Sequence, residues 1–169
     1  MKIQTFVLTP FQQNTRVVSC EETLKAICID PGEPSPDLIA YIRDNELELQ
    51  AIILTHGHLD HIGGTGALAA EFPDADVLLH EEEMYLYDLL PQQPLLMGIQ
   101  PHQMREMGME YEPAPAPTRF LEHGEIYDVG NLKFSIRHCP GHTRGHIVLT
   151  EKVRRAVFTG DCLFSGTIG

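Results

Sequence analysis

The chain has 169 residues, 43% of them hydrophobic, which is enough for one folded domain with a buried core. Its 24 acidic residues against 12 Lys and Arg give a formal net charge of −12, a sign that opposes binding to nucleic acid phosphates. No apolar stretch is long enough to cross a bilayer, and the N-terminal residues lack the pattern of an export signal. We therefore expect a single domain over residues 1–169, located in the cytoplasm, with neither a membrane nor a nucleic acid partner.

The N-terminal third is predicted to form strands and one helix. Three β-branched segments have the partial alternation of sheet strands: residues 3–8, 15–20 and 25–29. Between residues 36 and 46 apolar side chains return with helical spacing, and Ser35 is a suitable N-cap. The apolar run 51–54 then predicts a buried strand.

The middle of the chain is predicted to be mainly helical. Residues 64–71 and 80–90 have helical patterns, and a short strand over 76–79 separates them. We interpret the acidic run 81–83 as a solvated face of the second helix. Over residues 91–117 the pattern weakens, which predicts irregular helix and loop beside the site.

A second strand-rich block follows. It contains four strand-like segments: residues 126–129, 132–138, 147–150 and 155–159. Strand-rich blocks at both ends with helices between them predict an α/β fold, in which two sheets pack face to face with helices outside.

Histidine and aspartate side chains concentrate in three loops, each of which follows a predicted strand. The segments are 55–61 (THGHLDH), 140–146 (PGHTRGH) and 159–162 (TGDC). Three histidines and an aspartate within six positions do not suit an apolar core, because each buried polar atom needs a partner. A divalent metal ion is the partner that suits such a mixture of nitrogen and oxygen ligands.

The spacing within these loops suggests how the ligands divide. His56 and His58 are two positions apart on an extended loop, so with His142 they can supply three nitrogens to one ion and leave a position open for water. Asp60 and His61 face another way and could begin a second site.

The H-x-H-x-D-H loop, the P-G-H-T-x-G-H segment and the T-G-D turn together resemble the metallo-β-lactamase superfamily of hydrolases. The pairs Gln13-Asn14 and Pro140-Gly141, with the triplet 30–32 (DPG), are similar to its glyoxalase II-like branch. The resemblance implies an αββα sandwich with two metal ions, for which zinc is expected and iron or manganese is possible.

The resemblance also implies roles. Asp161 would bridge the two ions, and Asp60 would orient the nucleophile while it binds the second ion. Hydroxide formed at the metal would attack the carbonyl of a thioester such as an acylglutathione. In the family a further helix, a strand and one more histidine ligand lie beyond the position of Gly169, so we expect the chain to be incomplete at its C-terminus.

Two alternatives stay open. Persulfide dioxygenases share this fold and hold one iron with two histidines and an aspartate, which here would be His56, His142 and Asp161. A non-catalytic binding module with a degenerate metal site is the other alternative.

Three neighbouring residues are weaker candidates. His146 is expected to support the site through hydrogen bonds or packing. Arg144 could meet an anionic group of the substrate. Cys162 is expected to be a small buried apolar side chain, with approach to the metal as its alternative role.

Overall fold

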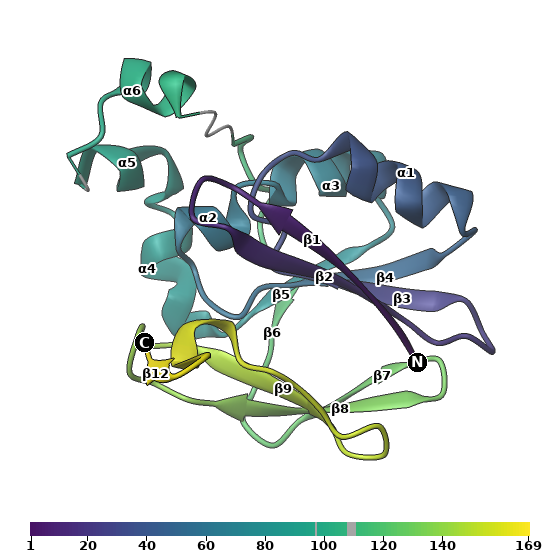
Figure 1. Cartoon of the computed structure of the whole chain (residues 1–169). Coiled ribbons are helices and arrows are strands. Elements are labelled where there is room, and N and C mark those ends of the chain that lie inside the picture. Colours follow the sequence, from purple (N-terminus) through teal and green to yellow (C-terminus); the bar gives the residue numbers. More distant parts are fainter. Residues whose placement is uncertain (97, 108–110) are drawn as a thin grey trace.

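The computed structural model describes residues 1–96, 98–107 and 111–169, and two facing β-sheets form its centre (Figure 1). The strands of the larger sheet lie side by side in sequence order: β1 (Lys2–Leu8), β2 (Gln13–Ser19), β3 (Lys25–Ile29), β4 (Glu48–Ile53), β5 (Asp76–Leu79) and β6 (Arg119–Phe120). Neighbours from β1 to β3 are antiparallel, and neighbours from β3 to β6 are parallel.

The smaller sheet is antiparallel, in the order β10-β9-β8-β7. Its strands are β7 (Ile126–Val129), β8 (Leu132–His138), β9 (Ile147–Glu151) and β10 (Ala156–Phe158). A short hairpin of β11 (Leu163–Phe164) and β12 (Thr167–Ile168) follows. The four strands of this sheet, and those of the larger sheet up to β5, lie at segments that the sequence predicts to be strands.

Apolar side chains from both sheets fill the space between them. Phe134, Ile136 and Leu149 of the smaller sheet are fully buried against Ile27 and Ile53 of the larger one. Burial of this kind is the main force that holds two stacked sheets together.

Helices cover the opposite face of the larger sheet (Figure 1). They are α1 (Pro36–Asp44), α2 (Leu59–Ile62) and α3 (Thr65–Glu71). Leu38 and Ile42 of α1 pack with Leu68 of α3 in this layer. Ser35 caps α1 as predicted, because its Oγ accepts a hydrogen bond from the backbone N–H of Leu38 (3.3 Å). The predicted α/β arrangement of two facing sheets with helices outside is therefore confirmed.

The prediction of one helix over residues 80–90 is wrong. The chain instead forms a 3-10 turn η1 (Glu81–Glu83), a short helix α4 (Met84–Tyr87) and a second 3-10 turn η2 (Leu90–Gln92). Glu83 is fully buried while its two acidic neighbours are exposed, so the interpretation of this run as a solvated face is wrong for Glu83. The reason is that the carboxylate turns inward to bond two loops of the site.

Residues 91–117 are irregular, as predicted, with the short helices α5 (Gln93–Leu96) and α6 (Pro101–Glu106). Part of that prediction, at Met97 and over 108–110, lies outside the described residues. Strand β6 was not predicted because only two residues of it pair with β5. None of the described helices is long and apolar enough to span a bilayer.

Candidate metal centre

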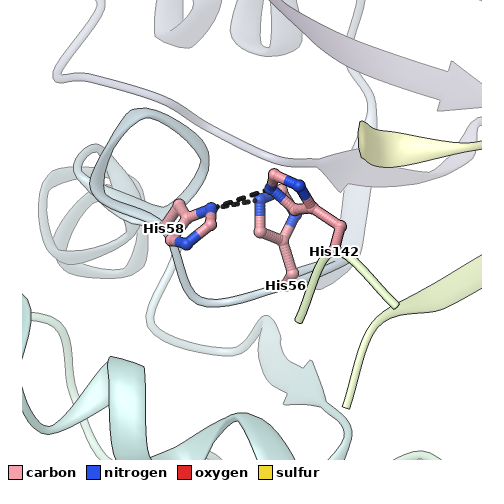
Figure 2. A group of neighbouring side chains, drawn as sticks. All are labelled: His56, His58 and His142. Atoms are coloured by element: carbon pink, nitrogen blue, oxygen red, sulfur yellow. Dashed lines mark hydrogen bonds between the residues drawn. The ribbon is translucent and has the colours of Figure 1, made fainter. Parts of the chain in front are cut away.

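Three imidazole nitrogens converge where β4 and β8 run out into loops (Figure 2). His58 Nδ1 lies 3.1 Å from His56 Nε2 and 3.0 Å from His142 Nε2. In a tetrahedral zinc site with Zn–N distances of about 2.0–2.1 Å, neighbouring nitrogens lie about 3.3 Å apart. We call these residues the first triad, and its donor set and spacing fit a divalent metal ion.

A second group of three donor atoms, the second triad, shares one histidine with the first. It consists of His56, His61 and Asp161, whose candidate ligand atoms all lie within 4.8 Å of one another. His61 Nε2 lies 3.2 Å from Asp161 Oδ1, while Asp161 Oδ2 lies 3.5 Å from His142 Nε2. The two oxygens of Asp161 therefore face different triads, which is the geometry that a bridging carboxylate needs.

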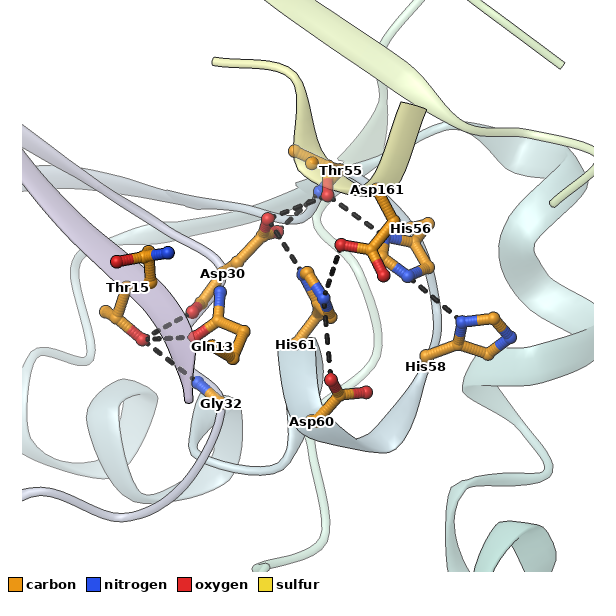
Figure 3. Close-up of polar contacts among 12 residues, drawn as sticks. Gln13, Thr15, Asp30, Gly32, Thr55, His56, His58, Asp60, His61 and Asp161 are labelled. Carbon is orange, nitrogen blue, oxygen red and sulfur yellow. Dashed lines mark hydrogen bonds and ion pairs between the residues drawn. The ribbon is translucent and has the colours of Figure 1, made fainter. Parts of the chain in front are cut away.

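Asp60 stands beside the second triad. Its Oδ2 lies 3.7 Å from His61 Nε2, and Figure 3 shows the carboxylate facing that ring. Asp60 belongs to neither triad as the side chains lie, so the structure brings five of the six predicted ligands into the triads and places the sixth next to them. Burial raises the pKa of Asp60, which favours a carboxylate that can accept a proton.

The two triads differ in charge. Burial lowers the pKa of His56, and it lowers that of His58 to about 4, so both rings are neutral at pH 7 and can donate a lone pair to a metal. Burial acts in the same direction on His61, but Asp30 and Asp161 outweigh it and raise the pKa of His61 to about 10. In return, and against the effect of burial, the His61 hydrogen bond lowers the pKa of Asp161.

Asp30 orients two of the histidines (Figure 3). Its Oδ2 lies 3.1 Å from His61 Nδ1 and accepts a hydrogen bond from the Thr55 hydroxyl (2.7 Å). Since that hydroxyl hydrogen is used on Asp30, Thr55 Oγ1 can accept from His56 Nδ1, which lies 3.1 Å away. Both rings then present Nε2 to the site, as metal-binding histidines held by outer partners do.

Glu83 joins the two loops that carry the first triad. Its carboxylate accepts one hydrogen bond from Gly57 N (2.7 Å) and one from Gly145 N (2.6 Å). A Cβ at Gly145 would lie 2.8 Å from Glu83 N, so the close approach of the two segments requires glycine there. Sequence reasoning missed Glu83, because nothing in the local pattern distinguishes it from the two exposed glutamates before it.

Gln93 was missed as well. Its Oε1 accepts a hydrogen bond from Leu59 N (2.8 Å), and its Nε2 donates to Gly57 O (2.7 Å) and Leu86 O (2.9 Å). This buried amide fixes the start of α2, where Asp60 and His61 lie. Its signal would have been a glutamine beside a proline in an irregular segment, which is too common to single out.

His146 holds the turn that carries Asp161. It is fully buried, which lowers its pKa to about 4, and its Nε2 accepts a hydrogen bond from Asp161 N (3.1 Å). The expectation that Cys162 is a buried apolar side chain is wrong, because it is half-buried and its Sγ lies 3.2 Å from a polar partner, His146 Nδ1. Gly160 has φ +48°, and a Cβ there would lie 2.5 Å from Thr55 Oγ1, so this tight turn requires glycine.

The triads border two cavities. A cavity of about 650 Å³ borders His61 and Asp161, and another of about 370 Å³ borders His58. Arg144 lines neither cavity; it is exposed, with its guanidinium 5.0 Å from the centre of the Tyr85 ring. The arrangement provides donors for two ions with space for a substrate on either side.

Residues 8–169 match the family model described as the metallo-beta-lactamase superfamily. The chain is 37% identical, over its whole length, to hydroxyacylglutathione hydrolase GloC of Haemophilus influenzae, of which it covers 75%. It is 30% identical to a hydroxyacylglutathione hydrolase of Bdellovibrio bacteriovorus over 88% of the chain and 47% of that protein.

Solved structures agree with the sequence matches. The chain superimposes on the BLEG-1 B3 metallo-beta-lactamase with a TM-score of 0.81 and 30% identity, over 99% of the chain and 76% of that structure. It superimposes on TTHA1623 in a di-iron-bound form with a TM-score of 0.81 and 31% identity, over 98% and 75% respectively. The chain thus spans about three quarters of the length of these two structures.

Proposed function

We propose that this chain, which belongs to the metallo-β-lactamase superfamily and is a metal-binding hydrolase of that fold, cleaves thioesters such as acylglutathiones. One observation carries the proposal: two adjoining triads, with Asp161 facing both, occur in a chain similar over its whole length to a hydroxyacylglutathione hydrolase. The donor set is that of a hydrolytic site for two ions.

The residues divide between the ions as follows. His56, His58 and His142 would hold the first ion through nitrogen alone, a donor set that suits zinc. His61 and Asp161 would hold the second, together with Asp60 after a small movement of its carboxylate. The mixed second set accepts iron or manganese as well as zinc, so we propose zinc for both and treat the metal as open to measurement.

The chain's own residues prepare the hydrolysis. A bound divalent ion supplies a water with a pKa near 7 and a positive charge that polarises the substrate carbonyl, as is general for such sites. Asp60 borders both cavities, so it can orient that water and accept its proton. Asp30 holds the rings of His56 and His61 in place, and Glu83 holds the two loops of the first triad, while the carbonyl carbon is attacked. A thiolate, with a reference pKa of about 8.5, then leaves without help from a general acid.

The test compares substrates and variants in the metal-loaded chain. We expect hydrolysis of S-D-lactoylglutathione, and the loss of at least about 10³-fold in kcat/KM in His58→Ala, because a metal contributes several kcal/mol to such a step. His123→Ala, which changes an exposed histidine away from the site, is the matched control and should retain wild-type activity.

Each other outcome contradicts the proposal in its own way. Oxygen uptake with glutathione persulfide by a form that holds one iron, without thioester turnover, would make the chain a persulfide dioxygenase. Full metal loading with no turnover of either substrate would make it a binding module.

A further inference from the structure

We infer that the acyl group of the substrate is an apolar chain, which lies in a cleft between α2, α4, α5 and the turn after β1; the inference rests on the proposed function. The cleft has a volume of about 370 Å³. Four apolar side chains line it: Phe11, Leu59, Leu86 and Leu96. We call this space the acyl cleft.

The acyl cleft begins at the metal centre. His58 of the first triad and Asp60 beside the second border it, and Leu59 lies between them in sequence. A carbonyl at the metal centre therefore has the cleft directly next to it. Phe11 and Leu96 are 49% and 72% exposed, so they leave apolar surface uncovered in the free protein.

The polar groups of the cleft offer little to a ligand. Of the lining residues with polar side chains, Gln93 already uses its amide on the backbone at Leu59, Gly57 and Leu86. This leaves the two that face the metal centre, His58 and Asp60. A hydroxyl group on the acyl chain would lose water without gaining a side-chain partner from the wall, whereas methylene groups gain from burial.

The second cavity has a more mixed wall. Alongside apolar side chains such as Phe164, it includes Gln12, Asn14 and the half-buried Arg16, whose guanidinium donates a hydrogen bond to Asn14 O (2.6 Å). Its amide groups and the Arg16 guanidinium can bind the polar thiol carrier of a thioester, which in an acylglutathione is a peptide. Asp60 borders both spaces, so a substrate can place its carrier on one side and its acyl chain on the other.

The test is a series of S-acylglutathiones with acetyl, butyryl, hexanoyl and octanoyl groups. We expect kcat/KM to rise roughly two- to fourfold per methylene group. The transfer free energy of one fully buried methylene group corresponds to about a fourfold change, and partial burial gives less. Leu96→Asp should remove most of this rise, because it places a charge at the apolar wall. Leu95→Asp is the matched control: Leu95 is 51% exposed but does not line the cleft, so its series should match wild type.

A second readout does not depend on turnover. Calorimetry measures the affinity of the metal-loaded chain for the matching straight-chain carboxylates, and the same rise with length is expected, again lost in Leu96→Asp. The proposal of an acyl cleft is overturned if affinity and kcat/KM do not change with chain length in wild type. It is also overturned if Leu95→Asp and Leu96→Asp change these series equally. Absence of turnover with every thioester overturns the proposed function, and the carboxylate series then still decides on the cleft.

Discussion

The two triads share His56 but are held in different ways. The first consists of nitrogens alone, and a buried carboxylate, Glu83, fixes it through the backbone of two loops. The second mixes two histidines with a carboxylate, and Asp30 fixes it through the ring of His61 itself. The first triad is therefore ready to bind a metal, whereas the second is closed by its own ion pair, His61 with Asp161, which an ion must replace.

The largest effect on this comparison should come from Glu83→Ala. It leaves the N–H groups of Gly57 and Gly145 buried without their acceptor, at about 1–3 kcal/mol each. We expect the free energy of unfolding to fall by about 2–5 kcal/mol, with weaker metal binding at the first triad, measured by urea denaturation and chelator competition. Glu82→Ala, at an exposed neighbour, is the control. Equal denaturation curves for the two variants would show that Glu83 does not stabilise the two loops.

A smaller and more local effect is expected from Asp30→Asn. The change removes the carboxylate charge beside His61 but keeps the shape of the side chain at position 30. The His61 ring therefore loses the charged partner that orients it. Metal affinity should fall about 10- to 100-fold, the usual cost of losing such an outer partner. Chelator competition measures this for each ion in turn. An unchanged affinity for the second ion would show that Asp30 does not orient His61 for metal binding.

The smallest effect is a difference in proton release. In the metal-free chain at pH 7 the His61 ring is positively charged, with a proton on both nitrogens, since its pKa is raised to about 10. The His58 ring, with a pKa of about 4, is neutral. Filling the second triad should therefore release about one proton and filling the first triad about none. Calorimetry in two buffers of different ionisation enthalpy measures this. Equal release at both steps would show that the triads are not charged differently.

The raised pKa of His61 also predicts how the unfolding free energy of the metal-free chain changes with pH. The folded-state pKa of His61 lies above its unfolded value of about 6.5. Its contribution to stability is thus fully present below pH 6.5 and is lost as the pH rises toward 10. His61→Ala should flatten the fall in unfolding free energy over that range, and an identical pH profile for the variant would contradict the raised pKa.

The sequence predicted the triads better than their supports. His56, His58 and His142 were found because their chemistry and spacing are rare outside metal sites, and each follows a segment with a clear strand pattern. The role of Glu83 depends on Gly145, 62 positions away, and no local pattern carries such a contact. The short β6 and the broken helix after β5 were missed for the same reason, because long-range pairing and an inward carboxylate outweigh local propensity there.

Metal bound at the two triads is what would make this chain a thioester hydrolase. The most direct test strips the chain of metal and follows the hydrolysis of S-D-lactoylglutathione and S-hexanoylglutathione, with elemental analysis, as zinc, iron or manganese is added back. We predict no activity without metal, and activity that rises as up to two ions bind per chain. Activity that does not depend on the bound metal, or no activity with both triads filled, would contradict the claim.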